Sequence, residues 1–189
     1  MADALWSLDA SCGELLVRTG VCGRAAKMGH RLTIAMASWR AEVSWSGEEP
    51  TAVRLTVAVD SLRVVRGEGG LMPLSAPEKT LVRSNALKCL HSDRYPNIRF
   101  QSGDIAAADD GYRLTGTLEI CGRVHPHVLD VRVADLGDAQ RICGDTVLRQ
   151  SEYGVRPYSM LMGSMQVADD VTVSFSATRV GARNHRAGR

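Results

Sequence analysis

Hydrophobic and polar residues alternate along several segments of the chain. In the segment 51–60, hydrophobic side chains occupy every second position, namely Val53, Leu55, Val57 and Val59. The same period of two recurs in 112–121 and in 170–179. Successive side chains of a strand point to opposite faces, so this period predicts strands with one buried face.

Five further segments are predicted as strands from less regular patterns: 14–19, 31–46, 96–106, 124–134 and 140–149. Within 31–46 the hydrophobic positions change parity, from even numbers up to Met36 to odd numbers from Trp39 onward. One extra residue near Ala37 and Ser38 produces such a change. We therefore expect a β-bulge or a tight bend at this point.

One segment has the spacing of a helix. Residues 77–91 begin with a proline, which suits the first turn of a helix. Their hydrophobic stripe consists of Leu81, Val82, Ala86, Leu87 and Leu90. The glycine-rich stretch 67–73 before them is expected to be a loop. The pattern as a whole predicts an all-β fold, an eight-stranded antiparallel β-barrel with one short helix at about 77–91.

Length and charge narrow the class of protein. The 189 residues suit a single domain, and a net charge of +2 is too small to indicate nucleic-acid binding. No hydrophobic run reaches the length of about 20 residues that a membrane-spanning helix needs. The segment 181–189 carries no core-forming residues, and we expect it to be a disordered tail.

The cysteines indicate a reducing compartment. They are odd in number and widely spaced: Cys12, Cys22, Cys89, Cys121 and Cys143. Residues 1–10 lack the cationic start and apolar core of a signal peptide. We therefore expect free thiols, no disulfide bond and a cytoplasmic location.

Four stretches together resemble a known family. The run 84–102, Ser-Asn-Ala-Leu-Lys-Cys-Leu-His-Ser-Asp-Arg-Tyr-Pro-Asn-Ile-Arg-Phe-Gln-Ser, ends a helix, turns at Tyr-Pro and begins an Ile-x-Phe strand. The others are Asp60-Ser61-Leu62, the Gly-x-Leu-x-Ile-x-Gly stretch of 116–126, and Val-Ala-Asp-Asp-Val-Thr-Val at 167–173. Their order and spacing resemble the YceI-like, polyisoprenoid-binding family over roughly residues 5–180.

The resemblance implies a fold and a ligand. It implies that residues 1–180 form a YceI-like, lipocalin-like lipid-binding barrel whose apolar interior holds an isoprenoid or a similar lipid chain. The start of the chain departs from the family, which often has two histidines there. This sequence has Cys12, followed by Gly13, where the first histidine would fall and Thr19 near the second, so those histidines give no guide to the site.

The candidate ligand-binding residues are mostly large and hydrophobic. They are Met36, Trp39, Leu81, Phe100, Leu118, His125, His127, Met160 and Met162. In a barrel with a ligand such side chains line the pocket, and in other proteins they are plain core. The apolar, methionine-rich stretch 153–165 suits adaptable lipid contact, a packed plug or a homodimer surface, and the sequence does not separate these. It consists of Tyr153, Tyr158, Met160, Leu161, Met162 and Met165.

His125 and His127 are the strongest candidates for metal chemistry. They lie two apart in a predicted strand, so both can face the interior, with Cys121 or His91 as a third ligand. The alternative is a pair that hydrogen-bonds polar groups or water. No spacing motif supports a metal, so we expect neither a metal nor a cofactor.

Two functions follow, in which the apolar strand faces indicate the pocket and the resemblance implies the ligand. The sequence carries no nucleophile elbow, phosphate loop or dinucleotide fingerprint, so we expect no enzyme. The leading hypothesis is binding, storage or transport of a long apolar ligand, a polyisoprenoid or isoprenoid quinone. The alternative is a packed barrel that acts as an interaction or stress-related scaffold. Gly116 and Gly144, on faces expected to point inward, favour open space inside.

Overall fold

The computed structural model describes residues 3–180, so the tail predicted at 181–189 lies outside the described residues. Within that range the chain forms twelve strands and one α-helix. Their bounds are β1 Asp3–Asp9, β2 Gly13–Cys22, β3 His30–Met36, β4 Trp39–Ser46, β5 Glu49–Ala58, β6 Leu62–Gly69, α1 Ala76–Cys89, β7 Asn97–Ala108, β8 Gly111–Ile120, β9 Arg123–Asp135, β10 Ala139–Arg149, β11 Ser159–Met160 and β12 Met165–Val180. Residues 3–180 also contain four short 3-10 turns: η1 Ala26–Met28, η2 Val59–Ser61, η3 Gln150–Tyr153 and η4 Leu161–Gly163.

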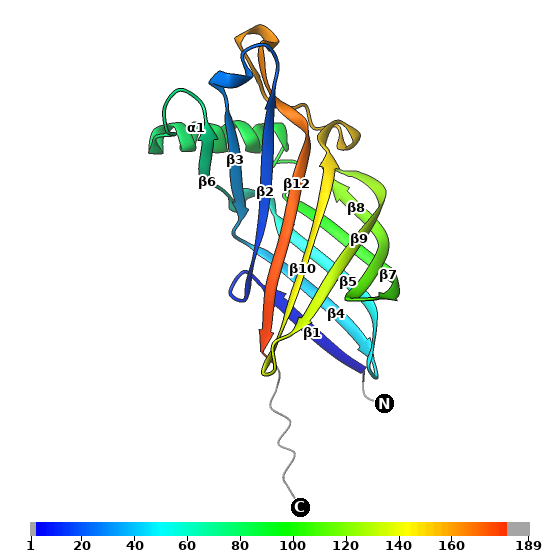
Figure 1. Cartoon of the computed structure of the whole chain (residues 1–189). Helices are drawn as coiled ribbons and strands as arrows, with labels where there is room; N and C mark the ends of the chain where they lie inside the picture. Colours follow the sequence, from blue (N-terminus) through cyan, green and yellow to red (C-terminus); the bar gives the residue numbers. More distant parts are fainter. Residues whose placement is uncertain (1–2, 181–189) are drawn as a thin grey trace, which may run out of the picture.

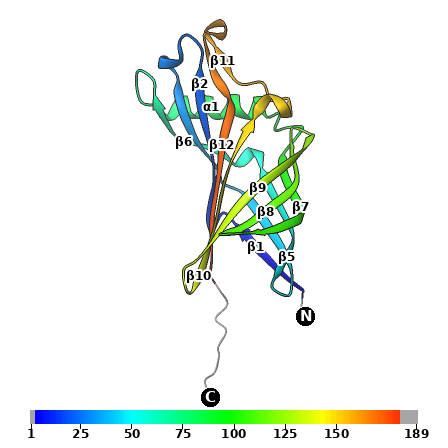
Figure 2. The ribbon, with the colours of Figure 1, turned by 45° about the vertical axis from the view of Figure 1, so that its right-hand side comes forward.

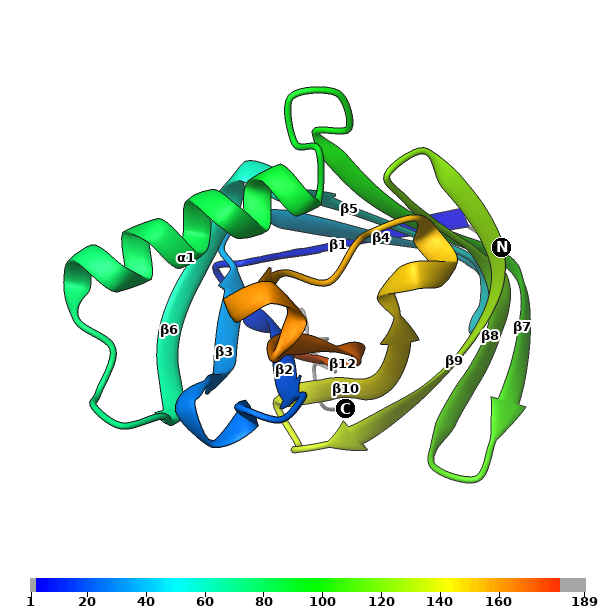
Figure 3. The ribbon, with the colours of Figure 1, turned by 90° about the horizontal axis from the view of Figure 1, so that it is seen from above.

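All the strands belong to one curled antiparallel sheet (Figure 1). Its spatial order is β1-β4-β5-β7-β8-β9-β10-β12-β2-β3-β6, and β11 pairs with β12. Seen along its axis, the sheet wraps around a central space as a half-barrel, with α1 along one side (Figure 3). The predicted all-β, antiparallel barrel-like fold is confirmed.

The number of strands is larger than the eight predicted. The predicted strand 31–46 is two strands, because the chain bends sharply at Ala37 and Ser38. Before the bend β3 pairs with β2 and β6, and after it β4 pairs with β1 and β5. The change of parity therefore marks the point where the chain passes from the end of the sheet formed by β2, β3 and β6 to the end formed by β1, β4 and β5.

Besides the two-residue β11, the strands β1 and β6 were missed, because exposed hydrophobic residues interrupt their alternation. In β1 the exposed Leu5 directly precedes Trp6, which lines the cavity. In β6, Thr33 of β3 pairs with Arg66 and Ile34 pairs with Val64, so Val65 is an extra residue in a bulge. A bulge shifts the inward face by one position, which conceals a period of two. The loop predicted at 67–73 thus begins later, after Gly69.

The helix α1 forms where the sequence predicts it. Ser75 caps its first turn by accepting a hydrogen bond from the Glu78 backbone, and Glu78 accepts one in return from the Ser75 backbone. Arg83 donates from Nε to the Leu62 carbonyl at 2.8 Å, and Lys79 donates to the Val65 carbonyl at 2.8 Å. These bonds fasten α1 to β6, across one end of the curled sheet (Figures 1 and 3).

The helix is also short and polar. No helix within residues 3–180 is long and apolar enough to cross a lipid bilayer.

Candidate functional site

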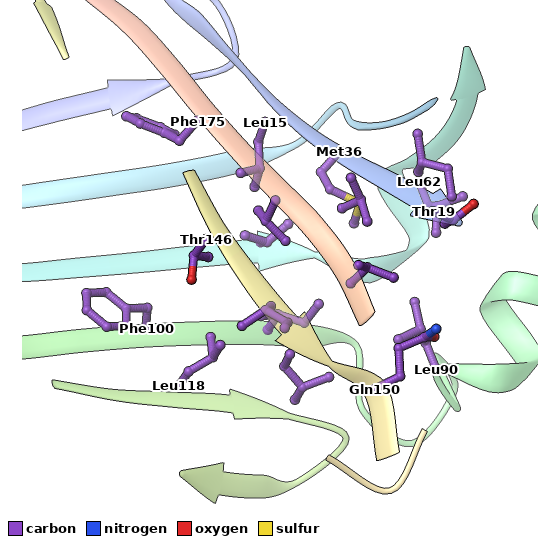
Figure 4. A pocket seen from close by; sticks show the side chains of 18 of the residues that line it. Leu15, Thr19, Met36, Leu62, Leu90, Phe100, Leu118, Thr146, Gln150 and Phe175 are labelled. Atoms are coloured by element: carbon purple, nitrogen blue, oxygen red, sulfur yellow. The ribbon is translucent and has the colours of Figure 1, made fainter. Parts of the chain in front are cut away.

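A large apolar cavity occupies the interior of the curled sheet. Its volume is about 660 Å³, which lies within the range of about 300–1,000 Å³ typical of small-molecule pockets. Leucine, valine, isoleucine and aromatic side chains make up most of its wall (Figure 4). Such a wall can bind an apolar molecule by removing it from water, without directional contacts.

The alternation in the sequence is the direct cause of this wall. On β5 the side chains of Val53, Leu55 and Val57 line the cavity, whereas Arg54 and Thr56 between them are exposed. The other long strands contribute every second residue in the same way. Curling of the sheet then brings all these inward faces around one space (Figure 4).

Aromatic side chains gather at the end of the cavity away from α1. The rings of Trp6 and Trp45 have centroids 4.1 Å apart, and Tyr112 packs edge-on against Trp45 at 6.5 Å. The guanidinium of Arg179, on β12, lies 3.6 Å from the centroid of the Trp6 ring, on β1. This contact joins two strands that are not neighbours in the sheet. The three rings form an aromatic end of the cavity, and the guanidinium of Arg179 packs on it.

One polar pair interrupts the apolar wall between the two ends. Nε2 of His127, on β9, lies 3.1 Å from the hydroxyl oxygen of Thr146, on β10. Phe100 packs edge-on against the imidazole ring, with centroids 6.3 Å apart. Burial lowers the pKa of His127 below its usual value, because the charged form loses its hydration. At neutral pH this wall therefore carries a neutral imidazole.

The opposite end of the cavity opens beside α1. The helix contributes Glu78, Leu81 and Asn85 to the rim, and the β11 segment contributes Met160 from the other side. His30 also lies on the rim, where its Nε2 donates to the carbonyl oxygen of Met72 at 2.7 Å. The polar groups of the cavity are thus concentrated at this opening.

Six of the nine predicted site residues line the cavity. They are Met36, Leu81, Phe100, Leu118, His127 and Met160. They come from five strands and the helix, and the curled sheet brings them around one space. Their contact with a ligand stays a prediction.

The other three predicted residues lie elsewhere. Trp39 is packed into the core, edge-on against Phe175 at 5.1 Å between ring centroids. His125 packs against Tyr153, and it is Tyr153 of η3 that reaches the cavity wall. Met162 stands at the tip of η4 with its side chain fully exposed. Parity or hydrophobicity alone selected these residues, and neither shows that Trp39 packs into the core, that η3 lies against His125, or that Met162 belongs to an exposed turn.

Residues from β1 and from η3 were missed. Trp6 and Leu8 line the cavity from a strand that was not predicted, and Gln150 lines it from η3, beside Tyr153 of the apolar stretch 153–165. Alternation of Trp6 and Leu8 is a signal for the first pair, although Leu5 weakens it. No periodic signal marks Gln150.

Gly144 and Gly116 play different roles. Gly144 lines the cavity, as expected of a small inward residue. A Cβ at Gly116 would lie 2.1 Å from the Gln101 carbonyl oxygen, so this glycine allows β7 to approach β8 closely. The expectation that Gly116 opens space inside is therefore wrong.

A metal site finds no support among the described residues. Within 3–180 no three His, Cys, Asp or Glu side chains gather closely enough to hold an ion. His125 and His127, the two candidate ligands, contact Tyr153 and Thr146 respectively.

Comparisons with known proteins agree with this fold. The family model described as the YceI-like domain matches residues 6–179. The crystal structure of Burkholderia cenocepacia BcnA is 19% identical, with a TM-score of 0.68, and the match covers 92% of this chain and 99% of that one. The Campylobacter jejuni YCEI protein is 15% identical, with a TM-score of 0.58 over 79% and 85% of the two chains. A search of curated protein sequences finds no match.

Proposed function

Because this chain belongs to the YceI-like domain family, we propose that it binds, stores or transports a long apolar molecule, such as a polyisoprenoid or an isoprenoid quinone. The observation that carries the proposal is the continuous apolar cavity of about 660 Å³. The ligand class comes from the resemblance to a polyisoprenoid-binding family. The aromatic end of the cavity, with Trp6, Trp45 and Tyr112, suits a planar ring or a branched chain end.

The energy of such binding comes from burial of the chain. Each methylene removed from water contributes about 0.8 kcal/mol, so a long chain needs few polar contacts. The wall offers mainly the His127–Thr146 pair and the groups at the rim. Loss of any single polar group should therefore weaken binding only modestly.

The alternative function, a packed barrel acting as a scaffold, has less support. A packed interior leaves room for no more than a few water molecules, at about 30 Å³ each. The cavity volume of about 660 Å³ favours an open interior.

Catalysis also has little support, and we propose that the protein is not an enzyme. Burial raises the pKa of the thiols of Cys89 and Cys121, which keeps them protonated and poorly nucleophilic at neutral pH.

The proposed cytoplasmic location rests on the free thiols of all five cysteines, which lie within residues 3–180. Cell fractionation tests the location.

Native mass spectrometry of purified protein, followed by solvent extraction, tests the function. We expect a co-purified lipid, or uptake of an added polyprenol or quinone. A protein that carries no lipid and takes none up would overturn the proposal.

A pair of variants separates an open interior from a packed one. Leu55→Trp places an indole on the cavity side of β5, and Thr56→Trp places one on the exposed face of the same strand. In an open cavity Leu55→Trp displaces at least two methylenes of ligand, which weakens binding by about tenfold or more and costs little stability. In a packed interior it would cost about 1–3 kcal/mol of stability. Thr56→Trp should change neither quantity.

A further inference from the structure

Hydrophobic side chains are exposed on three loops at the open end of the cavity. We call them the mouth surface: Met28, Leu71, Met72, Leu161 and Met162. Their exposed fractions range from 49% for Met28 to 105% for Met162. Single exposed hydrophobic residues are ordinary, but a group that rims a binding cavity marks an interaction site.

The three loops lie side by side. The backbone N–H of Ala25, in the β2–β3 loop, donates to the Ser164 carbonyl beside η4 at 2.8 Å. On the other side of the β2–β3 loop, His30 bonds to the carbonyl of Met72 in the β6–α1 loop at 2.7 Å. Figures 1 and 2 show these loops together at the end of the molecule beyond α1.

The conformation of η4 directs its side chains outward. Leu161 and Met162 both adopt left-handed backbone angles, with φ of 51° and 54°. These angles are unfavourable for residues with a side chain. Burial does not compensate for them here, because the two side chains are 54% and 105% exposed. The turn is held by backbone hydrogen bonds, among them Ser164 N–H to the Leu161 carbonyl at 3.1 Å, so both side chains are kept facing solvent.

The charge around the mouth surface is positive. The segments 23–29, 69–74 and 158–164 contain Arg24 and Lys27 and no aspartate or glutamate. Both basic side chains are exposed. Of the acidic residues that flank the second loop, Glu68 pairs with Arg66 at 3.1 Å, and Glu78 is engaged in the helix cap.

These features fit a lipid bilayer with anionic head groups. Exposed methionine and leucine side chains can enter the boundary between head groups and acyl chains, while basic side chains attract the anionic surface. A second copy of the chain would instead bring Arg24 and Lys27 toward the same charges. The cavity is continuous with this face, because Met28 belongs to the mouth surface and also lines the cavity.

We propose that the mouth surface docks on an anionic bilayer, so that an apolar ligand passes between the bilayer and the cavity without crossing water. The inference rests on the proposed function for the identity of the cargo. Docking itself requires only the three loops and their charge, and it is measurable on the protein without cargo.

Co-sedimentation with vesicles tests the proposal. The full chain is mixed with vesicles of phosphatidylcholine alone, or of phosphatidylcholine containing phosphatidylglycerol, with no polyisoprenoid in either. We expect binding to the vesicles with phosphatidylglycerol, and weaker binding as salt is raised. Absence of binding to both kinds of vesicle would overturn docking, and lipid uptake in solution would still report on the proposed function.

Two variants and two matched controls locate the contact. The double variant Arg24→Glu with Lys27→Glu should weaken vesicle binding by roughly fivefold or more per residue. The double variant Leu161→Ser with Met162→Ser should weaken vesicle binding at low salt and at high salt alike. The controls are Arg141→Glu and Leu136→Ser, which alter exposed residues of β10 and of the β9–β10 hairpin at the opposite end (Figure 1). We expect the controls to bind as the unmodified protein does.

Three further measurements separate loss of membrane docking from loss of folding and from loss of ligand binding. Thermal unfolding and uptake of a fluorescent fatty acid from solution should be unchanged in the loop variants, while transfer of lipid from vesicles should slow. Equal vesicle binding by loop variants and controls would overturn the proposal. So would a concentration-dependent dimer that only the loop variants abolish, because it would assign the mouth surface to a second copy.

Discussion

His127 is a titratable side chain within an apolar wall. Burial lowers its pKa, and the side chains that contact it, Phe100 and Thr146, do not titrate. The lowered pKa means that the unfolded chain binds a proton more readily than the folded protein just below pH 6.5. Stability contributed by the neutral ring is therefore complete above about pH 6.5 and is lost as the pH falls toward the folded pKa.

Ligand binding should follow the same direction. A bound chain removes further water from the ring and disfavours its charged form still more. We expect the affinity for an uncharged prenyl alcohol to fall as the pH is lowered from about 7.5 to 5.5, a window above the ordinary carboxylate range. Fluorescence titration measures this. His127→Gln should flatten the profile and His125→Gln should not. An identical slope in His127→Gln would contradict this role.

Cys89 provides a second report from inside the cavity. Its thiol lines the cavity wall and is partly buried, which raises its pKa, whereas Cys22 is exposed. We expect maleimide to modify Cys22 first, and a bound lipid to slow modification of Cys89 without affecting Cys22. Peptide mass spectrometry separates the two sites. Equal rates at Cys89 with and without lipid would show that the ligand does not occupy this part of the cavity.

At the scale of the elements, the prediction succeeded where a strand has one clean inward face. The strand β5 is an example, since its valines and Leu55 alternate with exposed residues along the whole cavity. It failed at β6, where the extra residue Val65 shifts the pattern. Bulges and bends depend on pairing with a strand far away in the sequence, so a local period cannot reveal them.

The helix α1 is held by polar contacts as well as by the packing of Ala86 and Leu87 against the core. All of its residues keep part of their surface exposed, and Arg83 bonds to the carbonyls of Leu62 and Asp60. We expect Arg83→Ala to destabilise the protein by about 1–2 kcal/mol, since a charged donor to two carbonyls is lost. The exposed Lys88→Ala, on the same helix, should have little effect. Urea unfolding gives the free energies, and hydrogen exchange should show faster opening of α1 in Arg83→Ala.

At the scale of the whole molecule, the sequence predicts the apolar interior but not all of its wall. Phe100 and Leu118 were identified because each belongs to a regular alternation. They are paired across β7 and β8, and both line the cavity. Trp39 has the same character but packs on Phe175 from a strand remote in sequence. Which large side chains face open space depends on how the sheet curls, and that is a property of the assembled fold.

The continuous cavity makes a final prediction about ligand length. It extends from the rim beside α1 to the aromatic cluster of Trp6 and Trp45, with the apolar wall between them. A prenyl alcohol lengthened by one isoprene unit buries further carbon atoms, each worth up to about 0.8 kcal/mol. We expect the dissociation constant to fall by about tenfold or more per unit until the cavity is filled, and then to level off. Displacement of a fluorescent lipid probe by a series of prenyl alcohols measures both the slope and the plateau. In Leu55→Trp the plateau should come at a shorter chain. Affinity independent of chain length would mean that the ligand contacts only the rim, and the long apolar interior would need another role.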